Sequence, residues 1–456
     1  MTTPPTPTPP DPTATPTRIC PVSHGSPFPT NDPRVPLYGS DFAADPHGLY
    51  GRLREQYGSL APVELEPGVP ATLVVRHATA VKILHDTDHF RSDPRIWQQH
   101  VPPGSAVLSM MGHLEAARFT DGDTHKRLRQ ACADAIDGVN LFDIPALVEG
   151  KAVALINQFC QTGHADLLEQ YASKLVLAVL NEIIGCSPEI GDRIATGMAL
   201  RFDSGGDAAQ GVAMLRDALS ALIKFKRAQP GDDITSRLVC HPAALDDEEM
   251  FAQLASLYGA GFEAQRNLLT NTVLLTLNDP RFHGDLHGGS LSTRDALDEV
   301  LFTDPPMTNF CIRYPRQPTL IDEVWLPPNQ PVLISLAGCN HDPAISAQDR
   351  TGNRSHLAWG AGPHICPAKS VAYLVAEHCV DQLLDALPEM KLAVPATELV
   401  WRPGPFHRAL SALPVTFPAT PPLVTGLWSF TTVPNTAGML TGGPALNRRR
   451  PTSRRL

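Results

Sequence analysis

The sequence predicts a mostly helical protein with small β-sheets. The stretch Glu248–Leu277, about 30 residues long, is apolar on most faces of a helix. A helix of about 30 residues spans about 45 Å, and apolar residues all around such a helix indicate that it is buried. Much of the remaining chain has apolar residues three and four positions apart, as amphipathic helices do. We therefore expect a central helix with other helices packed around it.

The same spacing predicts the other elements in chain order. Ahead of the central helix, the expected helices are Asp45–Tyr57, Ala78–His85, His125–Ala135, Ile144–Cys160, Glu169–Ile184, Ile190–Leu200, Ala208–Arg227 and Asp232–Val239. Behind it, the expected helices are Asp295–Phe302 and Lys369–Leu387. β-Branched runs predict strands at Ala71–Arg76, two within Val324–Leu336, and a hairpin at Trp401–Phe417.

The two ends of the chain differ in composition from the rest. Residues 1–17 are almost wholly Pro, Thr and Ala, and the segment up to residue 35 stays rich in Pro, so too little apolar surface is present to offset the entropy of ordering. From residue 418 the pattern degrades again, and the last ten residues contain five arginines. We predict one folded domain at 36–417 between disordered segments at 1–35 and 418–456.

Composition excludes several classes of function. A net charge of -10 argues against a general nucleic-acid binder, and no uninterrupted apolar run reaches the length of a membrane span. The nine cysteines are dispersed without a C-x-x-C pair, which favours reduced thiols in a cytoplasmic protein. No basic-then-apolar signal pattern opens the chain.

One cysteine lies in a loop rich in Gly and Pro, Trp359-Gly-Ala-Gly-Pro-His-Ile-Cys-Pro-Ala368, directly before a predicted helix. Such a loop can present the Cys366 thiolate to a metal, and amides at the start of the helix favour a negative sulfur with a lowered pKa. A lone thiolate suits axial ligation of haem better than a zinc cage. A buried, inert cysteine is the open alternative.

Two helical segments carry polar groups that need a partner. Gly261 and Glu263 lie in the middle of the central helix, where both cost stability; Glu263 either pairs with an arginine or has a functional role. His125 and Arg129 lie one turn apart and can face one anionic group. A solvated helix face would explain that pair equally simply.

The cysteine loop resembles the cytochrome P450 signature F-G-x-G-x-H-x-C-x-G. Gly360, Gly362, His364 and Cys366 match, while Trp359 stands in place of Phe and Ala368 in place of Gly. Weaker likenesses follow in the family order at 338–343 (A-N-R-D-P) and 408–415 (R-G-L-x-x-L-P-V). The resemblance covers about residues 40–417.

The resemblance implies the P450 fold, with haem b held between the long central helix and the Cys366 loop. Cys366 would be the iron ligand, with Trp359 and Gly360 beside the sulfur. The haem-binding residues implied for the propionates are His125, Arg129, Arg313 and His364.

The central helix resembles the family stretch A-G-x-[DE]-T, in which Ala260, Gly261 and Glu263 match and Ala264 replaces Thr. In the family that hydroxyl orders water for proton delivery. The implied catalytic group is therefore Gly261, Glu263, Ala264 and Gln265, with Glu263, Gln265 or a substrate hydroxyl holding the water.

The largest departure from the family is at Phe302, where the pattern E-x-x-R has its Arg. Glu299 is present, and we expect it to pair with Arg350 or Arg354. This feature resembles a Streptomyces-like actinobacterial subgroup that lacks the arginine and occurs in conservon operons, which implies GTPase-type signalling proteins as partners.

The implied activity is that of a monooxygenase inserting one oxygen atom from O2 into a small hydrophobic organic substrate. The sequence has no flavin or iron–sulfur motif, so electrons would come from a separate ferredoxin and ferredoxin reductase, with Lys126, Arg127 and Lys369 as docking residues. The alternative is a haem-binding protein of P450 fold with a regulatory or scaffold role and little turnover. The substrate pocket would be lined by 96–111, 198–211, 258–263, 307–311 and 404–407.

Overall fold

The computed structural model describes residues 34–202, 208–282, 291–345 and 353–423. The predicted terminal segments 1–35 and 418–456 lie almost wholly outside these ranges. Within them, Val35–Pro36 forms strand β1, and the backbone N–H groups of Thr420 and Leu423 donate to Cys160 and Asn157. The domain boundaries drawn from composition stay a prediction.

The prediction of a mostly helical fold with small sheets is confirmed. The longer helices are α2 (Pro46–Tyr57), α3 (His77–His85), α6 (Gly122–Asp137), α7 (Ile144–Ile156), α8 (Ser173–Ile184), α9 (Pro188–Phe202), α10 (Ala208–Ala228), α11 (Ile234–Cys240), α12 (Asp247–Asn278), α13 (Thr293–Thr303) and α15 (Lys369–Ala386). Short helices are α1 (Ser40–Ala44), α4 (Arg95–Gln98), α5 (Leu108–Met111) and α14 (Leu336–Asn340).

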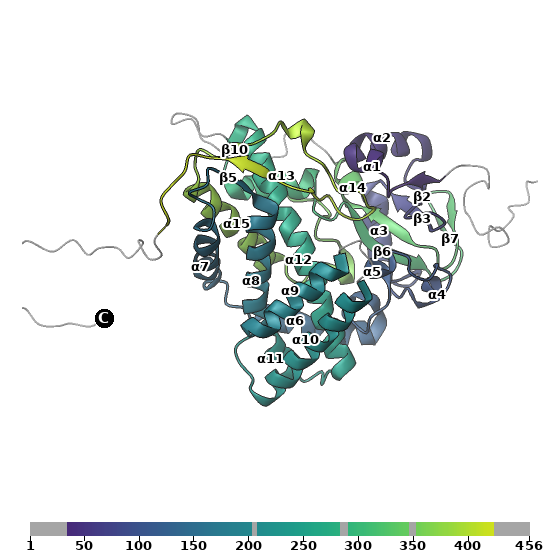
Figure 1. Ribbon diagram of the computed structural model, residues 1–456. Helices are drawn as coiled ribbons and strands as arrows, with labels where there is room; N and C mark the ends of the chain where they lie inside the picture. Colours follow the sequence, from purple (N-terminus) through teal and green to yellow (C-terminus); the bar gives the residue numbers. More distant parts are fainter. Residues whose placement is uncertain (1–33, 203–207, 283–290, 346–352, 424–456) are drawn as a thin grey trace, which may run out of the picture. The chain divides into compact units, whose positions relative to one another are not determined.

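Helix α12 is the predicted central helix. It begins with a capping box, in which the Asp246 side chain accepts from the Glu249 N–H and the Glu249 side chain accepts from the Asp246 N–H, so two N–H groups at the helix start are satisfied. Its sides pack against α8, α10, α13 and α15 (Figure 1). This contact on several sides is the physical reason for its apolar character on most faces.

The strands form a sheet of order β1-β2-β3-β9-β6-β4 and two smaller sheets, β10-β11-β5 and β7-β8. Their bounds are β1 Val35–Pro36, β2 Leu60–Glu64, β3 Pro70–Val74, β4 Phe90–Arg91, β5 His164–Asp166, β6 Asn309–Pro315, β7 Thr319–Ile321, β8 Val324–Leu326, β9 Val332–Ser335, β10 Lys391–Leu392 and β11 Pro414–Thr416. Strands β6 and β9 pair antiparallel with Arg313 opposite Val332, and a bulge separates Phe310 from Arg313.

The hairpin expected at Trp401–Phe417 is wrong as stated. Trp401 and Leu410 form only an isolated antiparallel bridge, and β11 pairs with β5 and β10 from elsewhere in the chain. Pro403 and Pro405 lie between the two bridge residues. Proline has no N–H to donate, so a continuous ladder cannot form there.

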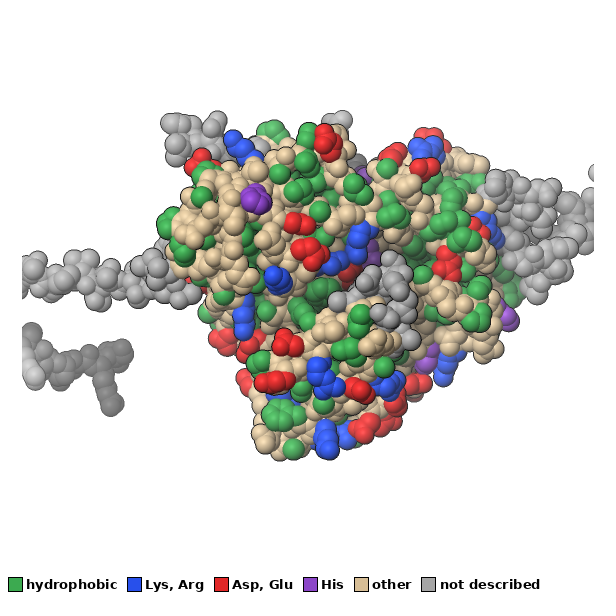
Figure 2. All heavy atoms as spheres, viewed as in Figure 1, with side chains coloured by type: hydrophobic (Ala, Val, Ile, Leu, Met, Phe, Trp, Pro, Cys, Tyr) green, Lys and Arg blue, Asp and Glu red, His purple; other side chains and the backbone are tan. Residues whose placement is uncertain are grey.

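Ion pairs on the surface tie neighbouring helices together. Arg216 of α10 lies 2.8 Å from Glu248, and Arg227 lies 2.7 Å from Asp247, both at the start of α12. Acidic and basic side chains are accordingly interspersed over the lower part of Figure 2, where α10 and α11 lie in Figure 1. Such exposed pairs each contribute little to stability, about 0–1 kcal/mol.

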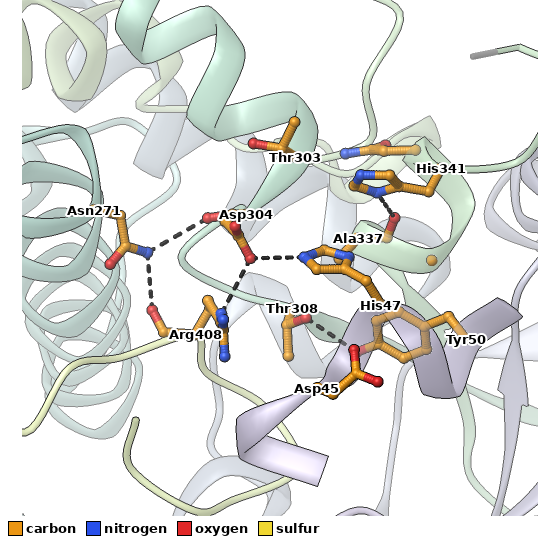
Figure 3. A network of polar contacts seen from close by, with 12 residues as sticks. Asp45, His47, Tyr50, Asn271, Thr303, Asp304, Thr308, Ala337, His341 and Arg408 are labelled. Atoms are coloured by element: carbon orange, nitrogen blue, oxygen red, sulfur yellow. Dashed lines mark hydrogen bonds and ion pairs between the residues drawn. The ribbon is translucent and has the colours of Figure 1, made fainter. Parts of the chain in front are cut away.

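A polar junction fixes the end of α13 (Figure 3). The Asp304 carboxylate lies 2.9 Å from Nε2 of His47 on α2 and 3.1 Å from Nε of Arg408. The Asn271 amide on α12 donates to the backbone oxygen of Arg408 at 3.0 Å. The junction therefore connects α2, α12, α13 and the C-terminal segment at one point.

Candidate functional site

The loop that carries Cys366 is shaped by two glycines in left-handed conformations. Gly360 has φ +72° and Gly362 has φ +70°, which other residues rarely adopt. A Cβ at Gly362 would also lie 2.3 Å from the Leu84 carbonyl oxygen. The Cys366 N–H donates to the Trp359 carbonyl oxygen at 2.8 Å and closes the loop. The two glycines thus bring the loop against α3 and fix the position of the thiol.

The electrostatics at Cys366 correct one expectation. Burial raises the pKa of the Cys366 thiol, and this outweighs the backbone N–H of Ala368 and the positive charges of Arg129 and Lys369, which act in the opposite direction. The helix start was expected to lower this pKa. Desolvation is larger because the sulfur is withdrawn from water, so the thiolate needs a cationic partner to form at neutral pH.

Four basic side chains gather next to this loop. His125 of α6 stacks on His364 with ring centroids 4.0 Å apart, and His364 Nε2 lies 3.1 Å from the Thr120 carbonyl oxygen. Arg129, one turn after His125, donates to the carbonyl of Ile365. Arg313 of β6 is only 6% exposed. The structure thus brings together residues from three distant parts of the sequence, α6, β6 and the Cys366 loop.

These side chains have more donors than the protein satisfies. His125 Nε2, His364 Nδ1 and Trp359 Nε1 are buried without a hydrogen-bond partner. In the described ranges, neither Arg129 nor Arg313 forms an ion pair within 4.0 Å. Burial, followed by the charges of Arg313 and His125, lowers the pKa of His364 to about 3. Such a cluster fits a ligand that carries negative charge, because buried cations and donors are otherwise costly.

Small and apolar residues near the middle of α12 and beside Cys366 remain accessible. Ala260 is exposed although it lies in the middle of a buried helix, and Gly259 has no atom within 4 Å of the position of a Cβ. Ile365, next to Cys366, is 43% exposed. Accessible apolar groups inside a fold indicate space for an apolar ligand.

Glu263 is surrounded by charges of its own protein. Its carboxylate accepts hydrogen bonds from Arg266, at 2.7 and 2.8 Å, and from Arg402. Burial would raise the pKa of Glu263, but Arg266, His407 and Arg402 together lower it below its usual value. Of the two roles considered for Glu263, the geometry matches pairing with arginine.

The other residues predicted on α12 face neighbouring helices. A Cβ at Gly261 would lie 3.1 Å from the Leu180 side chain of α8, so this glycine permits close packing. Gln265 donates its amide to the Ala372 carbonyl oxygen of α15 at 2.8 Å. Ala264 is partly exposed. Their catalytic roles stay predictions.

The surroundings of Phe302 exclude one of the two expected pairings of Glu299, the one with Arg354. Phe302 is 1% exposed and packs edge-on against His356. Arg354 bonds to Asp298, not to the expected Glu299, while Arg281 lies 3.7 Å from Glu299. The other proposed partner, Arg350, lies outside the described residues. One residue along a helix changes the direction of a side chain by about 100°, and the sequence alone did not fix which acid faces the loop.

The predicted docking residues are only partly available. Arg127 is bonded to Glu249 and to the Ala243 carbonyl oxygen, whereas Lys126 pairs only with the exposed Asp123. Lys369 is exposed at the start of α15. Arg127 is therefore a weaker candidate for a partner surface than the two lysines.

One residue near the site, Arg118, was missed by the sequence, whereas Cys311 lies at the end of the predicted pocket segment 307–311. Cys311 Sγ lies 3.2 Å from the position of a Cβ at Gly360, and the Arg118 guanidinium lies 4.9 Å from the Phe310 ring centroid. Neither residue belongs to a motif. The bulge in β6 turns Cys311 toward the loop and could not be read from a strand pattern.

Comparison with known proteins establishes the class. No protein-family model matches the chain. The chain is 31% identical over 395 residues to the cytochrome P450 monooxygenase PikC of Streptomyces venezuelae, covering 83% of this chain and 92% of PikC. It is 26% identical to the 6-deoxyerythronolide B hydroxylase of Saccharopolyspora erythraea, covering 84% and 98%. The solved structure of CYP154C4 from Streptomyces sp. ATCC 11861 matches with a TM-score of 0.77 at 26% identity, covering 85% and 99%.

The chain therefore belongs to the cytochrome P450 family and is similar to its bacterial, actinobacterial members. It is an enzyme of the P450 monooxygenase class, and the cofactor of this class is haem b. The residues around Cys366 fit that cofactor, since a thiol, unsatisfied donors and unpaired cations suit an iron porphyrin with two carboxylates. None of the described helices is long and apolar enough to cross a membrane.

Proposed function

We propose that this P450 inserts one oxygen atom from O2 into a small hydrophobic organic substrate, using electrons from a separate ferredoxin and ferredoxin reductase in the cytoplasm. The observation that carries the proposal is the cluster of Arg129, Arg313 and the two unsatisfied histidines beside the Cys366 loop. A ligand with negative charge and an apolar body would satisfy it.

Each residue of the cluster has a distinct role in the proposal. Cys366 would bind the iron, held in place by its N–H bond to the Trp359 carbonyl oxygen, with Gly360 allowing close approach. Arg313 and Arg129 would pair with the carboxylates of haem b, and His125 would donate from its unpartnered Nε2. His364, whose Nε2–H donates to the Thr120 carbonyl oxygen, would hold the His125 ring by stacking on it. When bound, haem b supplies the oxygen-activating chemistry of the class. The positive iron would also stabilise the thiolate that burial disfavours.

For proton delivery, we propose that water held near Ala264 serves as the donor. Ala264 has no hydroxyl, and the Glu263 carboxylate is bonded to Arg266 and Arg402. Gln265 donates to Ala372, so its carbonyl oxygen is left to accept from water. A hydroxyl group on the substrate would be a further way to hold that water.

The carbon monoxide difference spectrum of the reduced, purified protein tests the proposal. A strongly red-shifted Soret band is expected, because it reports thiolate ligation. NADPH consumption with ferredoxin, reductase and candidate substrates would then have to match product formed. A Soret band at the shorter wavelength of a lost thiolate, in protein that has bound haem, would contradict the role of Cys366.

A second function is a regulatory or scaffold role with little turnover, in the setting of the actinobacterial subgroup that lacks the E-x-x-R arginine. Phe302 and Ala264 favour it, together with the engagement of Glu263 by two arginines. Tight haem binding without turnover across a broad substrate panel would support this function, as would capture of a GTPase-type protein from the same operon. Coupled product formation would exclude it.

A further inference from the structure

Helix α13 is fixed at both ends. At its start, the Thr293 hydroxyl donates to Asp381 at 2.5 Å and Arg294 lies 2.7 Å from Glu377, both on α15. At its end, Asp304 forms the junction with His47 and Arg408 shown in Figure 3. A helix tied at two ends is a rigid support for a side chain that projects from its middle.

Asp298 projects from the middle of α13 toward the loop that precedes the cysteine. Arg354 Nε donates to Asp298 Oδ2 at 2.8 Å, and the Tyr373 hydroxyl of α15 donates to Oδ1 at 2.9 Å. The Asp298 side chain is 12% exposed and that of Arg354 is 59% exposed. Burial and the neighbouring carboxylate raise the pKa of Tyr373, so its hydroxyl stays protonated as the donor. Both oxygens of Asp298 are thus occupied by groups from different elements.

The residues after Arg354 are held by contacts that do not need a charge at position 302. His356 is 9% exposed and packs on Phe302, and burial lowers its pKa to about 4, so it is neutral. The Leu357 N–H donates to the Asn340 side-chain oxygen at 2.8 Å, and the Asn340 amide donates to the Phe302 carbonyl oxygen at 3.0 Å. The only charged tie between α13 and the described part of this loop is Asp298–Arg354.

We propose that Asp298, Arg354 and Tyr373 form a clamp that positions the segment 354–359, and through it the Cys366 loop. The path is short, because Trp359 ends this segment and its carbonyl oxygen accepts the Cys366 N–H. All three are positioning residues. That the clamp positions Cys366 as a metal ligand rests on the function proposed above. That it positions the segment 354–359 does not.

The test compares Arg354→Ala with Arg227→Ala in the full-length protein. Both changes remove one arginine that pairs with one acid, and the two side chains are similarly exposed, at 59% and 44%. Only Arg354 reaches the loop. Hydrogen exchange of the loop amides at 353–359 is measured first, because it does not depend on haem. We expect Arg354→Ala to accelerate it about fivefold over Arg227→Ala, the size expected for a partly exposed pair.

The second readout is the fraction of the carbon monoxide complex that keeps the red-shifted Soret band during incubation. Arg354→Ala should lose it about fivefold faster than Arg227→Ala, and Arg354→Lys, which keeps the charge without the planar guanidinium, should recover part of the difference. Equal exchange in the two alanine variants would overturn the clamp. Faster exchange with an unchanged Soret band would show that the clamp positions the segment 354–359 only, and would overturn its role in positioning the Cys366 thiol. A wild-type protein without that band would refute the proposed function. The exchange result would still show whether the clamp positions the segment 354–359.

Discussion

The basic cluster beside Cys366 and the charged cluster at Glu263 contain similar side chains but differ in how their charges are matched. At Glu263, one carboxylate accepts from Arg266 and Arg402, and the protein satisfies itself. Beside Cys366, Arg313 is buried without an ion pair in the described ranges, and two histidines each keep a buried ring nitrogen without a hydrogen-bond partner. Matched charges indicate a structural role, whereas buried unmatched charges indicate where a ligand belongs.

The largest expected effect lies at the thiol. Cys366→Ala should abolish the red-shifted Soret band and reduce turnover by about 10³-fold or more, as loss of an essential catalytic group does. Far-ultraviolet circular dichroism should be unchanged, because the loop is held by its backbone. Cys240→Ala, at an exposed cysteine, is the control. An unchanged haem spectrum in Cys366→Ala would refute the site.

Position 302 tests whether a charge is tolerated where the family has one. Phe302→Arg should destabilise the protein by about 4 kcal/mol, since it would bury a cation beside the neutral His356. Phe302→Leu keeps an apolar side chain and should cost about 1 kcal/mol. Urea denaturation measures both. A gain in haem retention in Phe302→Arg would show instead that the ion-pair network can be restored by one substitution.

Glu263→Gln should test the matched cluster. It leaves Arg266 and Arg402 without their carboxylate, and we expect a loss of about 3 kcal/mol in the free energy of unfolding with the carbon monoxide spectrum retained. Thermal unfolding of the wild type and the variant provides the measurement. Loss of turnover without loss of stability would move Glu263 into the catalytic group.

The same cluster gives a pH dependence with a definite sign. The folded-state pKa of Glu263 is lowered, so its contribution to stability is present above the pKa of the unfolded chain and is lost as pH falls through the folded value. As the pH falls below the usual pKa values of carboxyl groups, the free energy of unfolding should therefore decrease more in the wild type than in Glu263→Gln. Parallel acid titrations of the two proteins would contradict this.

Arg313→Ala tests the basic cluster beside Cys366 and has the smallest expected effect. Without haem, Arg313 is a buried cation whose pKa is lowered by burial, so its removal should leave the stability of the haem-free protein unchanged or raised. Haem retention should fall about tenfold, the size of a charged hydrogen bond. Haem transfer to an acceptor protein measures it. Loss of stability without haem would show that Arg313 has a partner within the protein.

Elements with strong local signals were predictable. Helix α12 was recognised because its length and apolar faces do not depend on the neighbours that bury it. The shared face of His125 and Arg129 on α6 was recognised from their spacing, and His125 is buried there while Arg129 is partly exposed. The hairpin at Trp401–Phe417 failed because pairing of β11 with β5 depends on residues some 250 positions away. The hydrophobic period and the strand propensity of a segment do not indicate which distant strand it will pair with.

The sequence by itself determined the cysteine loop, because Gly360, Gly362, His364 and Cys366 must occur at fixed spacing for the backbone to turn as it does. It also determined which side chains are chemically able to bind an anionic cofactor. Only the tertiary structure decided that Arg354 bonds to Asp298, that Glu263 is matched by Arg402, and that Cys311 faces the loop. These outcomes depend on the rotation of one helix and on one β-bulge, which are set by packing between distant segments.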